Sequence, residues 1–119
     1  MEEDEMLLEI LKQLQKKYNC VNEIHNTTKE IGDALSRDDR ISVQMLLGMR
    51  QEEMDKTDEC NHAVRMLESS LPVAEAHYYR EHEKVKEMKN KIQSVLDRCV
   101  ALDKIMSKRV GGKDSFYSS

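Results

Sequence analysis

Four histidines and numerous carboxylates are the side chains of this 119-residue chain that could bind a metal ion or transfer protons. Glu59 and His62 have the Glu-x-x-His spacing of di-iron helical bundles, in which two such motifs and two further inward carboxylates surround the metal pair. The sequence contains no second copy of this motif. We therefore expect no metal site.

The other histidines do not form a catalytic set either. His77 and His82 lie five residues apart, which places them on different faces of a helix, and we expect both at the surface. His25 lies on an apolar stripe, where a histidine is more often a hydrogen-bonded core residue than a ligand. The sequence has no Gly-rich phosphate loop and no nucleophile beside a base. It therefore predicts a protein that is not an enzyme and needs no cofactor.

Cys20, Cys60 and Cys99 lie roughly forty residues apart, and none has a second cysteine at zinc-finger spacing. An odd, dispersed set of cysteines favours a reducing compartment, so we expect a cytoplasmic protein. Cys60 and Cys99 fall on apolar stripes and are expected to be small core residues. The longest apolar run, residues 45–49, is too short to span a membrane.

The composition is typical of long helices. Charged residues make up 35% of the chain and aromatic residues 4%, with one Pro and four Gly. The net charge is −4, and the bases that follow Arg80 alternate with acids. This pattern indicates a solvated helix face and not a nucleic-acid surface.

A seven-residue repeat runs through the C-terminal third of the sequence. One heptad position is occupied by Tyr78, Val85, Ile92, Cys99 and Met106, and a second by Met88, Val95 and Leu102. Such a repeat predicts a coiled-coil stripe, which must be covered by other helices. No Gly or Pro interrupts residues 73–110, so the sequence predicts one continuous helix there. We expect Val85, Ile92, Val95 and Leu102 to be buried.

Two polar interruptions divide the chain into three predicted helices, at about 4–35, 39–69 and 72–110. Ser36 and Asp39 have the Ser-x-x-acid spacing of a helix start, and the short turn favours an antiparallel hairpin. Pro72 either separates two helices or kinks one. The sequence thus predicts an all-α fold, with three long helices in an antiparallel coiled-coil or helical-hairpin bundle. Residues 1–110 would form one domain, and 111–119 a flexible tail.

The stripe predicted for the second helix is broken in its middle. It consists of Met45, Leu46, Met49, Cys60, Ala63, Val64, Leu67 and Leu71. Between its two halves Glu53 and Lys56 occupy the stripe and could pair. Either this is a buried polar layer that fixes the helix register, or the helix is loosely packed or faces water there.

The end of the third predicted helix is apolar almost all round, because Val100 and Ile105 lie off the heptad stripe on opposite sides. Either this segment is packed within the bundle, or it keeps a face for a partner. We predict a partner-binding site formed by Leu96, Val100, Leu102, Ile105, Met106, Phe116 and Tyr117. Some of the helical residues in this set should be exposed, and the two aromatic residues of the tail could fold over a bound partner helix.

Several short motifs resemble the flagellar export chaperones of the FlgN type. They are Glu30-x-x-x-Ala34-Leu35, Asp38-Asp39, Leu46-Leu47-x-x-Arg50, the heptad helix and the tail from Gly111 to Tyr117. The resemblance covers nearly the whole chain. It implies a bacterial cytoplasmic chaperone that holds the C-terminal amphipathic helices of hook-filament junction proteins until the type III export apparatus takes them.

A second interpretation is a structural coiled-coil subunit, which would use the same stripe for permanent oligomerisation. An obligate interface is larger and more apolar than a transient one. A chaperone is therefore expected to be a monomer or a weak homo-oligomer with an exposed apolar surface.

Overall fold

The computed structural model describes residues 2–110, with side chains described for 5–108. It contains four helices: α1 (Glu2–Ser36), α2 (Arg40–Ser69), α3 (Val73–Arg80) and α4 (Glu83–Val110). Within residues 2–110 there is no strand, so the predicted all-α class is confirmed. The first two predicted helices correspond to α1 and α2. The predicted tail, 111–119, lies outside the described residues.

The turn between α1 and α2 is built from two consecutive aspartates. Asp38 has a φ of 54°, and the next amide, that of Asp39, donates to the carbonyl of Ala34 at 2.9 Å, which closes the end of α1. The carboxylate of Asp39 then caps α2 by accepting from the backbone N–H of Ser42 at 3.1 Å. Ser36, expected at the start of the second helix, is instead the last residue of α1.

The prediction of one continuous helix over residues 73–110 is wrong, because the chain breaks between α3 and α4. Pro72 directly precedes α3 and so separates two helices. The break itself involves no Gly or Pro. At its end the Nδ1 atom of His82 accepts a hydrogen bond from the backbone N–H of Lys84 at 3.2 Å. The His82 side chain thus caps the N-terminus of α4.

The break also changes the start of the heptad stripe. Tyr78, predicted to lie on the stripe, is exposed, and the neighbouring Tyr79 is buried in its place. The stripe is confirmed from Val85 onward, because Val85, Ile92 and Val95 are buried and Leu102 is half-buried. Coiled-coil spacing therefore predicts α4 correctly and fails only upstream of its first turn.

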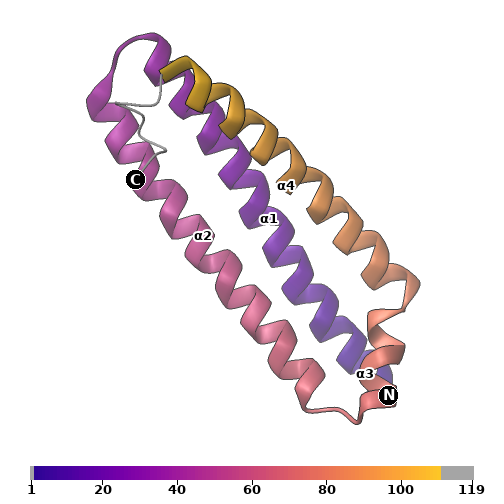
Figure 1. Cartoon of the computed structure of the whole chain (residues 1–119). Coiled ribbons are helices and arrows are strands. Elements are labelled where there is room, and N and C mark those ends of the chain that lie inside the picture. The colour runs from indigo at the N-terminus through magenta and orange to yellow at the C-terminus, as the bar shows by residue number, and fades with distance from the viewer. Residues whose placement is uncertain (1, 111–119) are drawn as a thin grey trace.

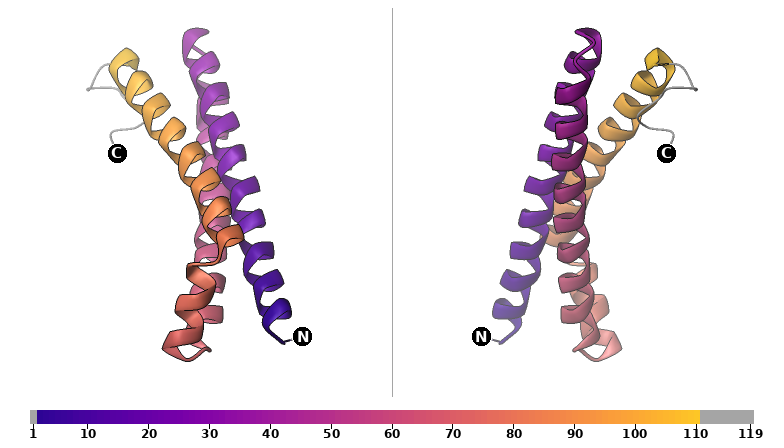
Figure 2. Two further views of the ribbon diagram at one scale, coloured as in Figure 1. Left: turned by 90° about the vertical axis from the view of Figure 1, so that its right-hand side faces the viewer. Right: turned by 90° about the vertical axis from the view of Figure 1, so that its left-hand side faces the viewer.

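Helix α1 is the centre of the bundle. Both α2 and α4 pack along it, whereas these two flanking helices hardly touch each other (Figure 1). In the side views of Figure 2, α4 crosses the hairpin of α1 and α2 obliquely. The result is an elongated molecule of 55 × 20 × 20 Å. Among residues 2–110, no helix covers one side of α1.

Two groups of buried side chains hold the helices together. The α3-end cluster consists of Ile10, Leu14, Val21, Ile24, Val64, Tyr79, Val85, Ile92, Val95 and Cys99. The hairpin-end cluster consists of Ile31, Ala34, Val43, Leu46 and Met106. Removal of this apolar surface from water is the main force that stabilises the bundle.

The buried face of α2 is narrower than predicted. Leu46, Cys60 and Val64 are buried as expected, but Met45 and Met49 are exposed. The reason is that, within residues 2–110, α2 packs mainly on α1, and one main neighbour covers only one side of a helix. The polar middle of α2 is partly at the surface, where Lys56 and Glu53 pair at 3.3 Å, as their spacing predicted.

Two glycines within helices give a first prediction. A methyl group added at Gly48 would meet no atom within 4 Å apart from its chain neighbours and the backbone of its own helix. Gly48→Ala is therefore expected to stabilise the protein by about 0.5–1 kcal/mol through helix propensity alone. At Gly32 the added methyl would lie 2.5 Å from the Cε atom of Met106, so Gly32→Ala is expected to give no such gain. Urea unfolding of both variants measures the difference. Equal stabilisation by both would contradict the close packing of Met106 on α1.

Candidate functional site

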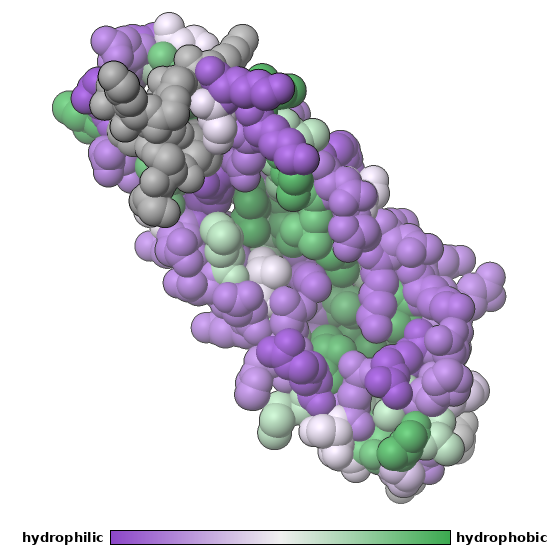
Figure 3. Space-filling model, in the orientation of Figure 1, coloured by the Kyte–Doolittle hydropathy of each residue, from purple (hydrophilic) through white to green (hydrophobic). Residues whose placement is uncertain are grey.

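The open side of α1 forms an apolar groove between α2 and α4. In Figure 3 apolar side chains make a strip along this face, with polar side chains on both sides. A hollow of about 310 Å³ in this groove is lined by Leu14, Lys17, Asn61, Val64, Arg65, Lys89, Ile92, Gln93 and Leu96. We call this site the α2/α4 groove. Each of the three long helices contributes to it.

The floor of the groove is part of the α3-end cluster. Leu14, Val64 and Ile92 come from α1, α2 and α4 respectively, and all three are buried. Leu96 is half-buried on the α4 side. A ligand that entered the groove would therefore contact an ordered apolar surface that already exists, so little reorganisation would be needed.

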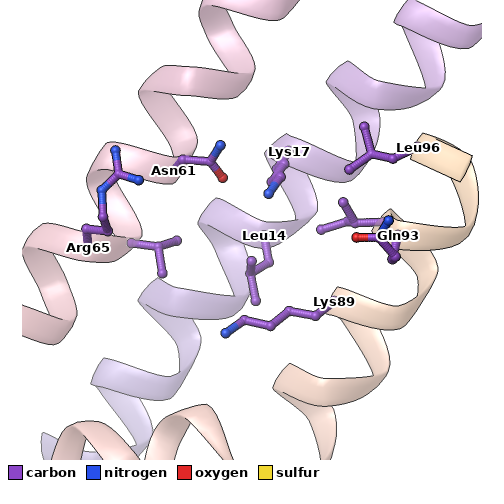
Figure 4. A pocket seen from close by; sticks show the side chains of 9 residues that line it. Leu14, Lys17, Asn61, Arg65, Lys89, Gln93 and Leu96 are labelled. Atoms are coloured by element: carbon purple, nitrogen blue, oxygen red, sulfur yellow. The ribbon is translucent and has the colours of Figure 1, made fainter. Parts of the chain in front are cut away.

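Three cations surround this apolar floor. Lys17 of α1, Arg65 of α2 and Lys89 of α4 line the groove, and no acidic residue does. In Figure 4 the side chain of Lys89 extends from α4 across the opening toward α2. Burial lowers the pKa of Lys17, and the positive charges of Lys89 and Arg65 lower it further. The groove is thus electropositive on a protein whose net charge is −4.

A polar bridge crosses the bundle between the two clusters. The Arg50 guanidinium donates to Asp103 Oδ1 of α4 at 2.8 Å and to the Thr28 hydroxyl of α1 at 3.3 Å. The Thr28 hydroxyl itself donates to the carbonyl of Ile24 at 2.7 Å. The bridge links α2 to α4, which hardly touch elsewhere. We did not predict it from sequence. A signal for it was that Thr28 interrupts the apolar heptad position occupied by Leu7, Leu14, Val21 and Leu35.

The helical part of the predicted partner-binding site is divided by the structure. Val100 is 53% exposed and Ile105 is 54% exposed, as expected for the two off-stripe residues. Val100 follows Leu96 by one turn, so it continues the groove side of α4. Ile105 is five residues further on, about 140° around the helix, and faces away from the groove.

Met106 is the clear correction to the predicted site. It is only 3% exposed and belongs to the hairpin-end cluster, so it is a core residue. Leu102 is half-buried against the same cluster. Of the predicted set, Leu96 and Val100 remain on the groove side. Phe116 and Tyr117 lie outside the described residues.

The candidate catalytic and metal-binding residues do not come together. Glu59 and His62 are both exposed on α2, and within the described residues no three His, Cys, Asp or Glu side chains are placed to hold a metal ion. His25 is half-buried, and its pKa is lowered by burial and by the charges of Lys29 and Arg98. In the part of the chain that the structure describes, no helix combines the length and the apolar character needed to cross a membrane.

The cysteines are placed as expected. Cys60 and Cys99 are buried, and burial raises the pKa of both thiols. Cys20 is half-buried, and burial, the Glu53 carboxylate and Cys60 raise its pKa. A raised pKa lowers the thiolate fraction at neutral pH, so none of the three has the character of a reactive nucleophile.

Comparison with known proteins finds no family model, no curated protein and no solved structure that matches this chain. The site must therefore be interpreted from its own geometry.

Proposed function

We propose that this protein is a helix-binding chaperone, and that an amphipathic helix of its partner occupies the α2/α4 groove. The observation that carries the proposal is the open side of α1. Two helices flank it without touching each other over most of their length, and the floor between them is apolar. A helix laid into the groove by side chains at i, i+3, i+4 and i+7 would cover this surface.

The arrangement has the geometry of a four-helix bundle from which one helix is missing. In such bundles the apolar side chains of each helix interdigitate with those of two neighbours. Within residues 2–110, α1 is the long helix along which both α2 and α4 pack. Both flanking helices present side chains toward the vacant corner, among them Asn61 and Leu96. An added helix would give both flanking helices their second neighbour.

The resemblance to flagellar export chaperones supports the same mode of binding and suggests a partner. We extend the proposal to the C-terminal amphipathic helix of a hook-filament junction protein, held in the cytoplasm until the export apparatus takes it. The groove fits transient binding because its floor belongs to a core cluster that already packs α1 against α2 and α4. A permanent structural subunit would instead need its apolar surface buried at all times.

Val100 and Ile105 form a matched pair that tests the location of the site. Both are exposed to the same degree on α4, and only Val100 lies on the groove side. Val100→Asp is expected to weaken binding of a synthetic C-terminal helix from a hook-filament junction protein at least about tenfold, because it introduces a charge beside the apolar floor. Isothermal titration calorimetry with the full chain measures this effect.

Ile105→Asp is the control, and it is expected to leave binding within about twofold of the unchanged protein. Weakening by Ile105→Asp alone would move the site to the opposite side of α4. A peptide that binds equally to both variants would not occupy the groove. Light scattering on the protein alone distinguishes the chaperone from a structural coiled-coil subunit. An oligomer that persists on dilution would favour the structural subunit.

A further inference from the structure

The α2/α4 groove brings together three cations, Lys17, Arg65 and Lys89. They come from three different helices and converge on one apolar floor. The ion pairs found within the described residues are Arg50 with Asp103, Lys56 with Glu53, Arg80 with Glu68 and Lys86 with Glu81. None of them involves a cation of the groove. Lys17, Arg65 and Lys89, like most lysines and arginines of the chain, have no ion-pair partner within the described residues, and they differ from the others in sharing one groove.

This grouping is unfavourable in the isolated protein. Lys17 is partly removed from water, and the like charges of Lys89 and Arg65 repel it, so its pKa is lowered first by burial and then by these charges. The chain has 23 acidic residues, and an acid at the position of Asn61 or Gln93 would relieve the repulsion. Both lining positions carry a neutral amide instead. Sites that are unfavourable for folding are often the ones required for binding.

We propose that the α2/α4 groove selects an acidic amphipathic helix, whose apolar face covers Leu14, Ile92 and Leu96 while carboxylates beside that face pair with Lys17, Arg65 and Lys89. The inference rests on the proposed helix-binding function and adds the chemistry of the partner. A carboxylate placed among these cations would neutralise their repulsion in a site that the bound helix shields from water. The three cations would also fix the direction in which the helix lies.

The apolar floor argues for a helix over a simple anion. A small anion or a nucleic-acid backbone would pair with the cations but would leave Leu14 and Ile92 uncovered, and the groove offers no aromatic side chain for base stacking. An acidic amphipathic helix would cover the apolar floor and also pair with the cations. It also brings favourable long-range attraction to the groove, which increases the rate of association at low salt.

Three synthetic helices test this selection. They share one leucine face and differ at the three positions beside it, which carry Glu, Gln or Lys. Binding of each to the full chain is measured by fluorescence anisotropy at low and high salt, at concentrations where the peptides are monomeric. We expect the Glu helix to bind at least about tenfold more tightly than the Gln helix, and the Lys helix most weakly. The preference should decrease as salt is added.

Lys89→Glu and Lys91→Glu provide the matched control within the protein. The two lysines are exposed on α4 two residues apart, and only Lys89 lines the groove. Lys89→Glu is expected to remove most of the preference for Glu over Gln while the Gln helix still binds. Lys91→Glu is expected to keep the preference within about twofold.

The possible outcomes separate the inference from the proposed function. Equal binding of the Glu and Gln helices would overturn the inference and leave the helix-binding function standing. Failure of all three helices to bind would overturn both. Equally tight binding of a Glu peptide with a scrambled leucine face would make the site a general polyanion site, against the proposal. A dimer of the protein alone that Lys89→Glu dissociates would identify a second copy as the occupant and would also overturn it.

Discussion

Truncation of Ile92 to Ala is expected to lower the free energy of unfolding by about 2–4 kcal/mol. Ile92 is 3% exposed and lies in the α3-end cluster, where α4 packs on α1. Removing its three outer carbons loses the apolar transfer energy and leaves a space that the rigid helices fill only in part. Because Ile92 also lines the groove, neighbouring side chains can move partly into the space left by the truncation. The loss of stability is therefore expected toward the lower end of this range. Urea unfolding followed by circular dichroism measures it.

Ile105→Ala is the matched control for this experiment. It removes the same atoms from the same helix at a position that is 54% exposed. The expected change is within about 0.5 kcal/mol, as for most surface substitutions. If the two truncations had equal effects, α4 would not be packed in the way described, and the heptad stripe would instead be the contact surface of an oligomer.

The sequence predicted α4 well because helix geometry makes its buried residues recur every seven positions. Residues seven apart return to the same side of a helix, so the buried positions at Val85, Ile92, Cys99 and Met106 could be read directly. The break before α4 has no comparable sequence pattern. Sequence rules look for Gly or Pro, whereas here the ring nitrogen of His82 accepts the N–H of Lys84. Any donor or acceptor of suitable reach can end a helix, so this boundary depends on the fold.

The exposed methionines of α2 illustrate a second limit. Periodicity shows which residues share a side of a helix, but it does not show how many neighbours that helix has. The sequence was interpreted with Met45 and Met49 on a buried stripe. Both are exposed because, within the described residues, α1 is the main neighbour of α2. The same missing neighbour creates the groove. The site therefore could not be located from helix patterns alone.

The candidate site was predicted in part for a related reason. The excess of apolar residues near the end of α4 correctly indicated an exposed apolar surface, which includes Val100 and Ile105. Whether each faces the groove depends on where α1 and α2 lie around α4, which sequence does not specify. The cations of the groove are separated by at least 24 positions in the chain, so their convergence required the fold. The sequence shows these basic residues, but it does not show that they lie in one groove.

The polar bridge has a structural role distinct from the groove. It lies between the α3-end cluster and the hairpin-end cluster and connects the two helices that otherwise hardly meet. Loss of this connection should affect the C-terminal turns of α4 more than the rest, because those turns have Met106 as their only fully buried side chain among residues 100–108. Segments with few buried contacts open at lower free energy than the whole protein.

Replacement of Arg50 by Ala is accordingly expected to lower the free energy of unfolding by about 2–3 kcal/mol, since it removes charge-assisted hydrogen bonds at a side chain that is only 14% exposed. A double-mutant cycle with Asp103→Ala should give a coupling of about 1–2 kcal/mol, limited by the 41% exposure of the Asp103 side chain. The same cycle on Lys56 and Glu53 is the control and should give a weaker coupling, because the Lys56 side chain is 59% exposed and the pair joins residues of one helix. Hydrogen exchange should become faster at residues 100–108 and stay unchanged at the start of α4. A coupling near zero for Arg50 and Asp103, with uniform exchange along α4, would mean that packing on α1 alone holds α4 in place.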